Sequence, residues 1–535
     1  MSNPSTDLAR AAVTALRGSG VREVVLAPGS RNAPLSFALY DAAQAGGLRL
    51  HTRIDERTAA FLALGLAKVG GRPAAVTCTS GTAVANLLPA VVEAAHAGVP
   101  LVVVTADRPA RVRGTGANQT THQDGIFGTF APTLDVAGAD LAELLAFLRS
   151  HEHRRPVHLN LQLDEPLLPD DGGWDGGEVP DRPAAADGAP VEHLVLDPGP
   201  RTVVVAGDDA GPPARVLAEK AGWPLLAEPS SGCRTGDSVV RTYRLLLAGT
   251  LGDRVERVVV HGHPTLSRPV SRLLARDDVE VVSVRHRGMW SQRPFRVARE
   301  VDRVDVSGPG DPAWSAEWHE ADRRVSRDLD ALLAGEPDLT PYEVAGAVSR
   351  ALPPGGLLFV GASNPVRDLD LMVARYEVGG RRKVVANRGL AGIDGTISSA
   401  VGAALSRPRS SRALALMGDV TFLHDTTGLV LGPREERPDL TIVVVNDDGG
   451  SIFATLEQGA PEHADRFDTL FGTPHGVDLA SLCAAMRVPH LRVASLPELE
   501  QALATPNGGI EVVEARVRRD NRGELDAKIR ALAHP

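Results

Sequence analysis

The 535-residue sequence predicts an α/β protein made of three consecutive, doubly wound, parallel-sheet domains. Three observations lead to this fold class. Short apolar runs typical of buried parallel strands alternate with helical stretches along nearly the whole chain. The chain is too long for one hydrophobic core, which favours about three domains. A stretch rich in Pro, Gly, Asp and Ala at 169–200 interrupts the alternation, as an interdomain linker does.

The first domain is expected at residues 1–185. A helix capped by Thr6 should open it and end at Gly18 or Gly20. Apolar runs then predict strands at 21–27, 74–78, 101–105 and 157–161, separated by helical stretches that include 57–69 and 83–97. This βαβ alternation implies a parallel sheet that binds ligands beyond the carboxyl ends of its strands.

Two further α/β domains are expected after the linker. The second spans 190–335, with strands at 202–206, 258–261 and 279–284 and a polar, mostly helical stretch at 308–339. The third spans 340–535, with strands at 357–360, 384–386, 413–417, 440–445 and 510–514. A basic cluster in the second domain (Arg285, His286, Arg287, Arg293) fits a solvated strand end or a regulator site, and the strand end is favoured.

The bulk composition is that of a globular protein and argues against several functions. No apolar segment is long enough to span a membrane, and the N-terminus lacks the pattern of a secretory signal, so a cytoplasmic location is expected. A net charge of −10 argues against a general affinity for nucleic acid. The cysteines (Cys78, Cys233, Cys483) lie too far apart for a metal spacing, which favours buried or idle thiols.

Polar turns follow two of the predicted strands in the third domain. Gly418 and Asp419 come after the strand at 413–417, and the run from Asn446 to Gly450 comes after the strand at 440–445. Oxygen-bearing side chains beside glycines, at the carboxyl ends of parallel strands, suit a hard cation that carries a phosphate. Asp, Asn and Gly are also what ordinary turns use, and the spacing by itself leaves both interpretations open.

Other loops carry groups that suit a ligand. Glu56 opens an apolar helix, where an acidic residue also simply favours the helix dipole. Small residues at 80–82 form a strand-to-helix turn, where a phosphate or a ring edge can approach backbone N–H groups. Ser363 and Arg367 share one face if their segment is helical. Arg31, Arg108, Gln119 and Arg388 lie in further turns.

Gly418-Asp419 followed by Asn446 resembles the metal and diphosphate motif of thiamine-diphosphate (ThDP) enzymes, GDG and later NN. Val420 replaces the last glycine of that motif, and Asp447 replaces its second asparagine. The motifs PGSRNAPL, IDERTAAF, TADRP, GANQ, SNPVRDLD and NRGLAGIDG, in that order, narrow the resemblance to the MenD family of menaquinone biosynthesis. The resemblance covers effectively the whole chain and is weakest in the second domain.

The resemblance implies a transferase that makes 2-succinyl-5-enolpyruvyl-6-hydroxy-3-cyclohexene-1-carboxylate (SEPHCHC). Such an enzyme decarboxylates 2-oxoglutarate and adds the succinyl carbanion to isochorismate in a 1,4 sense, releasing CO₂. The implied cofactors are ThDP and Mg²⁺ or Mn²⁺, held between pyrimidine-binding and diphosphate-binding domains on either side of a central one. The implied assembly is a homodimer or homotetramer with each site at a subunit interface, and neither nucleic acid nor a membrane span is expected.

The resemblance also implies roles for single residues. Glu56 would bind the pyrimidine ring, which requires a water-poor place and a raised carboxyl pKa. Asp419, Asn446 and the backbone carbonyl of Asp448 would hold the metal, and Ile393 would wedge the cofactor into its bent shape. The further cofactor contacts would be Ser80, Gly81, Thr82, Ser363, Gly418, Val420, Gly449, Ile452 and Phe453. Arg31, Arg108, Gln119, Arg268, Ser363, Arg367 and Arg388 would line the substrate site.

Two alternatives remain beside this interpretation. Another ThDP-dependent enzyme, such as a 2-oxoacid decarboxylase or an acetolactate-synthase-like protein, would share Glu56, Asp419 and Asn446. It would not need the arginines in GSRNAPL, TADRP and SNPVRDLD, because bidentate guanidinium groups are suited to substrate carboxylates. A non-catalytic nucleotide-binding or regulatory protein would use the same turns only as turns.

Overall fold

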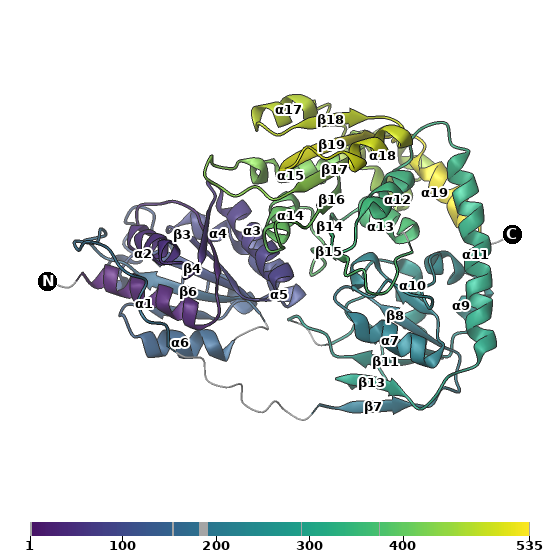
Figure 1. The fold of residues 1–535 in the computed structure, drawn as a ribbon, viewed down its shortest axis with the longest axis horizontal. Coiled ribbons are helices and arrows are strands. Elements are labelled where there is room, and N and C mark those ends of the chain that lie inside the picture. The colour runs from purple at the N-terminus through teal and green to yellow at the C-terminus, as the bar shows by residue number, and fades with distance from the viewer. Residues whose placement is uncertain (1–2, 152–154, 181–190, 290–291, 374, 534–535) are drawn as a thin grey trace.

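The computed structural model describes residues 3–151, 155–180, 191–289, 292–373 and 375–533. Three parallel sheets of six, five and six strands follow one another along the chain, and helices cover them (Figure 1). The predicted fold class is therefore confirmed. The boundary predicted at 185–190 lies outside the described residues, and the domain limits stay predictions.

The first sheet has the strand order β2-β1-β3-β4-β6-β5. Its strands are β1 (Glu23–Leu26), β2 (Arg49–Thr52), β3 (Ala74–Cys78), β4 (Leu101–Asp107), β5 (Thr133–Val136) and β6 (Val157–Gln162). Its helices are α1 (Pro4–Gly18), α2 (Ala33–Gln44), α3 (Glu56–Gly70), α4 (Thr82–Ala85), α5 (Leu88–Ala97) and α6 (Leu141–Ser150). The sequence did not reveal β2 and β5, because both are partly exposed edge strands without an apolar run.

Two predictions for the first domain were wrong in detail. Asn3, not Thr6, caps α1, because its side-chain oxygen accepts a hydrogen bond from the backbone N–H of Thr6 and Pro4 begins the helix. The helix predicted at 83–97 is two helices, α4 and α5, with a break at Asn86 and Leu87.

The second sheet has the order β12-β11-β10-β8-β9. Its strands are β8 (Thr202–Ala206), β9 (Leu225–Ala227), β10 (Arg257–His261), β11 (Glu280–Val284) and β12 (Arg299–Val301). The helices here are α7 (Pro212–Ala221), α8 (Tyr243–Leu246), α9 (Thr250–Asp253) and α10 (Arg268–Leu274). A separate pair joins β7 (His193–Leu196) to β13 (Arg303–Val306). The prediction of a linker over 169–200 was therefore wrong near its end, because β7 lies inside it. Residues 181–190 of the predicted linker lie outside the described ranges.

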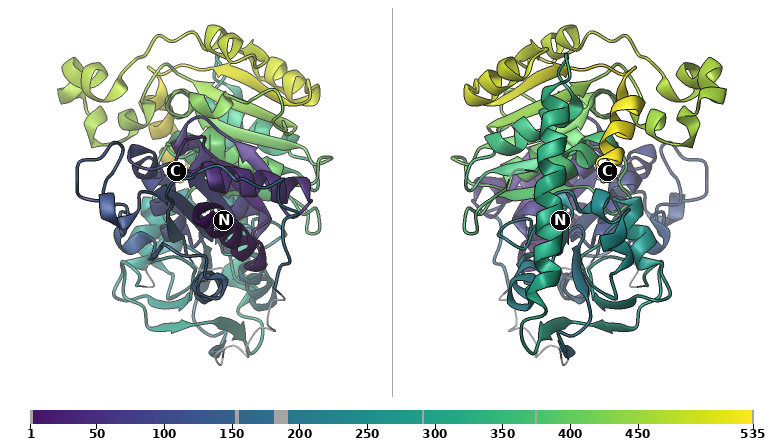
Figure 2. Two further views of the ribbon diagram at one scale, coloured as in Figure 1. Left: turned by 90° about the vertical axis from the view of Figure 1, so that its left-hand side faces the viewer. Right: turned by 90° about the vertical axis from the view of Figure 1, so that its right-hand side faces the viewer.

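A long helix, α11 (Pro312–Ala334), confirms the helical prediction for 308–339. Figure 2 shows it running along the outside of the second and third domains. Trp314 and Trp318 on its inner face belong to an apolar core that also contains Tyr342, Leu525 and Ile529 of the third domain. The helix therefore packs against both domains, and its inner face is buried rather than solvated.

The third sheet has the order β15-β14-β16-β17-β19-β18. Its strands are β14 (Leu357–Val360), β15 (Lys383–Ala386), β16 (Ala413–Gly418), β17 (Leu440–Asn446), β18 (His490–Val493) and β19 (Ile510–Arg516). Its helices are α12 (Pro341–Ala351), α13 (Asn364–Met372), α14 (Thr396–Leu405), α15 (Asp419–His424), α16 (Ala464–Phe467), α17 (Leu479–Ala485), α18 (Leu496–Ala504) and α19 (Arg522–Ala531). Thr340 and Glu343 form a capping box at the start of α12.

Short helical turns complete the described elements. They are η1 (Ala110–Val112), η2 (Gly128–Phe130), η3 (Pro229–Ser231), η4 (Thr426–Leu429), η5 (Ser451–Thr455), η6 (Glu457–Gly459), η7 (Pro461–His463) and the π-helical η8 (Asp468–Gly472). No helix in the described ranges is both long and apolar enough to cross a membrane. Cys78, Cys233 and Cys483 are buried and unpaired, as predicted.

Helices α3 and α14 join the first domain to the third. Glycines allow the close approach: a Cβ at Gly65 would lie 2.1 Å from the carbonyl oxygen of Ser399, and one at Gly402 would lie 2.2 Å from that of Leu62. One apolar core continues across this contact, from Phe61 on α3 to residues of both sheets. The two domains are therefore fixed relative to each other within one chain.

Candidate active site

The carboxyl ends of β16 and β17 lie side by side at one edge of the third sheet. The strands pair in parallel with Gly418 opposite Val445, so the turns that follow them meet. Asp419 starts α15 and is only 2% exposed. Its Oδ1 accepts a hydrogen bond from the backbone N–H of Val420 (2.7 Å), and its Oδ2 accepts one from that of Gly449 (2.9 Å). Burial raises the pKa of the Asp419 carboxyl group.

Asn446 and Asp448 lie at the end of β17 and in the loop after it. The Asn446 amide is buried: Nδ2 donates to Oε1 of Glu514 (2.7 Å), and Oδ1 accepts from the backbone N–H of Asp448 (3.0 Å). Asp448 has a left-handed φ of 60°, and its backbone carbonyl accepts a hydrogen bond from Nη1 of Arg519 (2.8 Å). Because a carbonyl oxygen has two lone pairs, one remains for a metal ion.

A cavity of about 170 Å³ opens at this sheet edge. The described residues that line it all belong to the third domain. They include eight of the residues predicted to bind the cofactor: Ser363, Ile393, Gly418, Asp419, Val420, Gly449, Ile452 and Phe453. Loops after β14 and β15, the end of β16 and the turn after β17 supply them, as expected for a ligand site of a parallel sheet.

Two side chains at this edge fall outside the predicted set. His475 lies with Nε2 3.1 Å from Oδ2 of Asp419 and Nδ1 3.4 Å from Oδ1 of Asp448. Asp447 lines the cavity, and burial together with the Asp419 carboxylate raises its pKa to about 7. Asp447 was visible as a departure from the family motif. A single histidine such as His475 has no spacing pattern that could have revealed it.

The residues at this edge fit a hard cation that carries a diphosphate. Asp419, Asn446 and the Asp448 carbonyl provide one carboxylate, one amide and one backbone oxygen, which are the donors Mg²⁺ prefers. A Cβ built on Gly418 meets no other atom within 4 Å, so the cavity is open where a ligand would approach. The described residues hold no cluster of three His, Cys, Asp or Glu side chains suited to a metal, so ligand oxygens would have to complete the coordination.

Glu56 lies in the first domain, at the start of α3. The helix is capped by Asp55, whose Oδ1 accepts hydrogen bonds from the backbone N–H groups of Arg57 (2.9 Å) and Thr58 (3.3 Å). The Glu56 side chain is half-buried, and its Oε2 accepts a hydrogen bond from Nδ2 of Asn86 (3.4 Å). The water-poor setting that its predicted role requires is thus incomplete in a single chain.

The turn at Ser80, Gly81 and Thr82 is held by two glutamines. Ser80 Oγ donates to the backbone carbonyl of Gln119 (2.9 Å), and Gln119 Nε2 donates to that of Ser80 (2.8 Å). Gly81 has φ 78°, and its N–H donates to Oε1 of buried Gln123 (2.9 Å). A Cβ at Gly81 would lie 2.8 Å from Cγ of Gln119, so this turn requires glycine. Gln123 was not predicted from the sequence.

Arg31 and Arg108 form a second group near this turn. Nη1 of Arg31 donates to the backbone carbonyl of Leu163 (3.1 Å), and Nη2 of Arg108 donates to that of Asn118 (3.1 Å). Burial and the neighbouring Arg108 charge lower the pKa of Arg31. Nε of Arg108 is buried without a hydrogen-bond partner among the described residues. Two guanidinium groups with spare donors form a suitable site for carboxylates.

Arg367 and Arg388 lie where the third domain meets the second. Nη1 of Arg367 donates to the backbone carbonyl of Ser363 (2.6 Å), which is the N-cap of α13 and lies outside the helix, so the two residues are close together at its start. Arg388 is buried, and its Nη2 donates to Oγ1 of Thr265 in the second domain (2.7 Å). Burial and the Arg388 charge lower the pKa of Arg367, so these cations also lie close together.

Glu228 of the second domain holds the loop that carries Thr265. Its Oε1 accepts hydrogen bonds from the backbone N–H groups of Thr265 (3.0 Å) and Leu266 (2.9 Å). Burial raises the pKa of Glu228 to about 8. A fully buried carboxyl group therefore sets the position of a hydroxyl group that in turn orients Arg388.

Arg268 is not part of these groups. It begins α10, and its guanidinium pairs with the carboxylate of Glu457 at 2.8 Å, with both side chains largely exposed. The predicted residues of the first domain are likewise separate from the third-domain cavity, since none of them is among the described residues that line it. The described part of one chain therefore holds the predicted site residues of the first and third domains in two separate groups, called half-sites below.

Comparison with known proteins matches the first and third domains to one family. Residues 6–126 match the N-terminal TPP binding domain of thiamine pyrophosphate enzymes, and residues 368–514 match the C-terminal TPP binding domain. A 2-succinyl-5-enolpyruvyl-6-hydroxy-3-cyclohexene-1-carboxylate synthase of Nocardioides sp. is 70% identical over 99% of this chain and 98% of its own length. Synthases of the same name from Kineococcus radiotolerans (48% identical, 97% of each chain) and Saccharopolyspora erythraea (44% identical, 99% of this chain and 100% of the relative) are also similar.

Proposed function

The chain belongs to the thiamine pyrophosphate enzymes, as one of the SEPHCHC synthases, and we propose here which residues and substrates it uses. It is a ThDP-dependent transferase of menaquinone biosynthesis. The substrates we propose are 2-oxoglutarate and isochorismate, with CO₂ as the second product. The arrangement that supports them most is the pair of arginine groups beside the predicted cofactor residues, because both substrates carry carboxylates.

In the third domain, Asp419, Asn446 and the Asp448 carbonyl would hold Mg²⁺ or Mn²⁺, and the Ile452–Phe453 turn would close over the diphosphate. Ile393, in the cavity wall, would support the cofactor between its two ring systems. When bound, ThDP supplies the nucleophilic carbon and the electron sink that decarboxylation of a 2-oxoacid needs. Asp419→Ala should abolish Mg²⁺-dependent retention of ThDP during gel filtration. Normal retention would refute the proposed metal ligands.

In the first domain, Glu56 would bind a pyrimidine nitrogen and share a proton with it. This requires that the half-buried carboxyl group be covered, because desolvation favours its protonated form. We propose that the third domain of a second subunit covers it, in a homodimer or homotetramer, so that each site uses Glu56 of one chain and Asp419 of another. A cytoplasmic location is part of the same proposal.

The two arginine groups would bind substrate carboxylates. Arg31, Arg108 and Gln119 would act from the first domain, and Ser363, Arg367 and Arg388 from the third. Each charge-assisted hydrogen bond to a carboxylate is worth roughly 1.5–3 kcal/mol, so the groups both select dicarboxylates and fix their orientation. Arg268 would join them only if it leaves Glu457.

A coupled assay tests this function. Purified protein with ThDP, Mg²⁺, 2-oxoglutarate and isochorismate should release one CO₂ for each isochorismate consumed. The loss of isochorismate is followed by its absorbance. Pyruvate in place of 2-oxoglutarate is the matched control, since it lacks the second carboxylate. Preference for pyruvate, with isochorismate left unchanged, would favour an acetolactate-synthase-like activity instead.

A further inference from the structure

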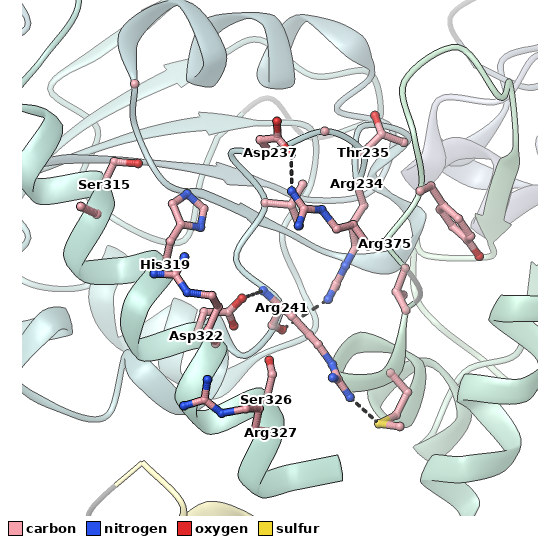
Figure 3. A pocket seen from close by; sticks show the side chains of 18 of the residues that line it. Arg234, Thr235, Asp237, Arg241, Ser315, His319, Asp322, Ser326, Arg327 and Arg375 are labelled. Atoms are coloured by element: carbon pink, nitrogen blue, oxygen red, sulfur yellow. Dashed lines mark hydrogen bonds and ion pairs between the residues drawn. The ribbon is translucent and has the colours of Figure 1, made fainter.

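A large groove lies away from both half-sites. Its volume is about 1250 Å³, and none of the described residues that line it belongs to the predicted cofactor or substrate set. Figure 3 shows its two walls: α11 presents Ser315, His319, Asp322 and Ser326, and the segment from Arg234 to Arg241 lies opposite. Val239, Met372, Val373 and Tyr376 add an apolar floor.

The two faces of α11 differ in polarity, and the face toward the groove is basic. Its inner face buries Trp314, Trp318 and Val325 in the apolar core. The face toward the groove carries Arg323 and Arg327, one turn apart and both exposed. Like charges at this spacing destabilise a helix slightly, so the pair is not explained by helix stability.

Every acidic side chain that lines the groove already has a partner. Asp330 pairs with Arg241 at 2.7 Å, and Asp237 pairs with Arg375. Asp322 accepts hydrogen bonds from the backbone N–H groups of Arg241 (3.1 Å) and Thr242 (2.6 Å) and from the Thr242 hydroxyl. No acidic side chain of the groove lining is therefore left for Arg323 or Arg327.

The spare charge of the groove is thus positive. Arg234 pairs with buried Asp370 at 2.8 Å, and Arg350 pairs with Glu500 at 3.0 Å. Within the described part of the chain, neither Arg323 nor Arg327 forms an ion pair or hydrogen bond. In the same wall, Oγ of Ser326 is buried without a hydrogen-bond partner among those residues. Two unpaired guanidinium groups and an unsatisfied hydroxyl group call for an anionic, hydrogen-bonding occupant.

The size of the groove indicates what kind of anion fits. Its volume exceeds the roughly 300–1,000 Å³ of typical small-molecule pockets. Ser315 and Asp330 lie about 22 Å apart along α11 at 1.5 Å per residue, a length that about six extended residues would span. We propose that the groove docks an extended acidic segment of a partner protein, with its carboxylates on Arg323 and Arg327 and its backbone along the apolar floor.

Fluorescence polarisation with the holoenzyme, saturated with ThDP and Mg²⁺, tests this proposal. The probe is fluorescein-labelled hexaglutamate, and labelled hexaglutamine is the neutral control. Hexaglutamate should bind and hexaglutamine should not, and added salt should weaken the binding. Arg327→Glu should weaken it at least tenfold. Arg324→Glu, the same charge change on an exposed residue of the same helix that does not line the groove, should alter it less than twofold.

Three kinds of result would overturn the proposal. The first is no binding of hexaglutamate, or equal binding by the Arg327→Glu and Arg324→Glu variants. The second is displacement of the peptide by pyrophosphate at lower concentration than by unlabelled hexaglutamate, which would assign the groove to a small polyanion. The third is dissociation of the oligomer in Arg327→Glu during analytical ultracentrifugation, which would assign it to a second copy of this chain. None of these readouts depends on which substrates the enzyme uses.

Discussion

At the scale of single residues, buried carboxyl groups perform different tasks according to what they contact. Asp419 is held by backbone N–H groups at a sheet edge and keeps its oxygens near a cavity. Glu228 is held the same way, by the backbone N–H groups of Thr265 and Leu266, and so it fixes the loop that carries them. Arg388 shows the consequence, because its orientation depends on Thr265, a residue of another domain.

Thr265→Val should test this dependence, since valine has the shape of threonine without its hydroxyl group. Losing the acceptor for the Arg388 guanidinium should raise KM for a carboxylate substrate by roughly tenfold, the usual effect of one hydrogen bond to a charged group. Thr265→Ser keeps the hydroxyl group and should restore KM. Steady-state kinetics with both substrates measure this. Equal KM values for the two variants would show that Thr265 does not position Arg388.

Glu228 should make stability depend on pH. Its pKa is about 8 in the folded protein against 4.5 as the ordinary value, because burial disfavours the charge, with Asp370 and Asp208 adding to this and Arg388 opposing it. Between these values the folded chain holds a proton that the unfolded chain has released, so stability falls as pH rises from about 5 to about 8. Glu228→Gln keeps the accepting oxygen and should remove this part of the pH dependence.

Thermal unfolding of both proteins at several pH values measures the effect. The melting temperature of wild type relative to Glu228→Gln should decrease steadily across that range. A constant difference would mean that the carboxyl group is already ionised at pH 5.

At the scale of elements, the contact between α3 and α14 decides how the first and third domains are held. Small residues bring the two helix backbones together, and the surrounding apolar core then extends through both sheets. Because Glu56 begins α3, the same helix that joins the domains also carries the predicted proton-sharing residue. Packing at this contact therefore influences the orientation of Glu56, which lies nine residues before Gly65 on the same helix.

Gly402→Ala should destabilise this contact. Its Cβ would lie 2.2 Å from the Leu62 carbonyl oxygen, and backbone atoms cannot yield as a side chain can. We expect a loss of roughly 1–3 kcal/mol, as for other overpacked interiors, seen as a lower melting temperature. Gly70→Ala on α3 is the control, since its nearest neighbour would be 3.7 Å away. It should be neutral or slightly stabilising, and equal losses in both variants would contradict the packing argument.

At the scale of the whole molecule, the chain holds its two half-sites apart. The third-domain cavity and the first-domain residues around Glu56 each lie at the carboxyl edge of a parallel sheet. The α3–α14 contact fixes their relation, so closing one chain on itself would break a continuous core. In the proposed assembly, a second chain would instead bring its Glu56 to each cavity.

Mixing two inactive variants tests this arrangement. Glu56→Gln and Asp419→Ala should each abolish activity in separate samples. Co-refolded or co-expressed at equal amounts, they should recover about a quarter of the wild-type sites if subunits of a symmetric dimer exchange at random. An Asp419→Ala chain mixed with an Asp419→Asn chain is the negative control. Activity that stays absent in the first mixture would place both residues of a site in one chain.

Much of the fold could be predicted because it depends on local patterns. The apolar runs at β3, β8, β14, β16 and β17 mark buried strands, and their boundaries agree with the structure to within about one residue. Edge strands such as β2 and β5, and β7 inside the predicted linker, could not be found, because a strand exposed on one side needs no apolar run. The comparisons confirm the predicted family and activity. The sequence allowed this prediction because family motifs are short contiguous segments in a fixed order.

The sequence by itself therefore determined the fold class, the family and eight of the residues that line the cavity. Only the tertiary structure decided that His475 and Asp447 join Asp419, that Thr265 and Glu228 stand behind Arg388, and that a basic groove lies along α11. The physical reason is the same in each case. These contacts join residues that are far apart in the chain. Sequence periodicity predicts helices and strands, but it does not predict which single side chains will meet once these elements pack together.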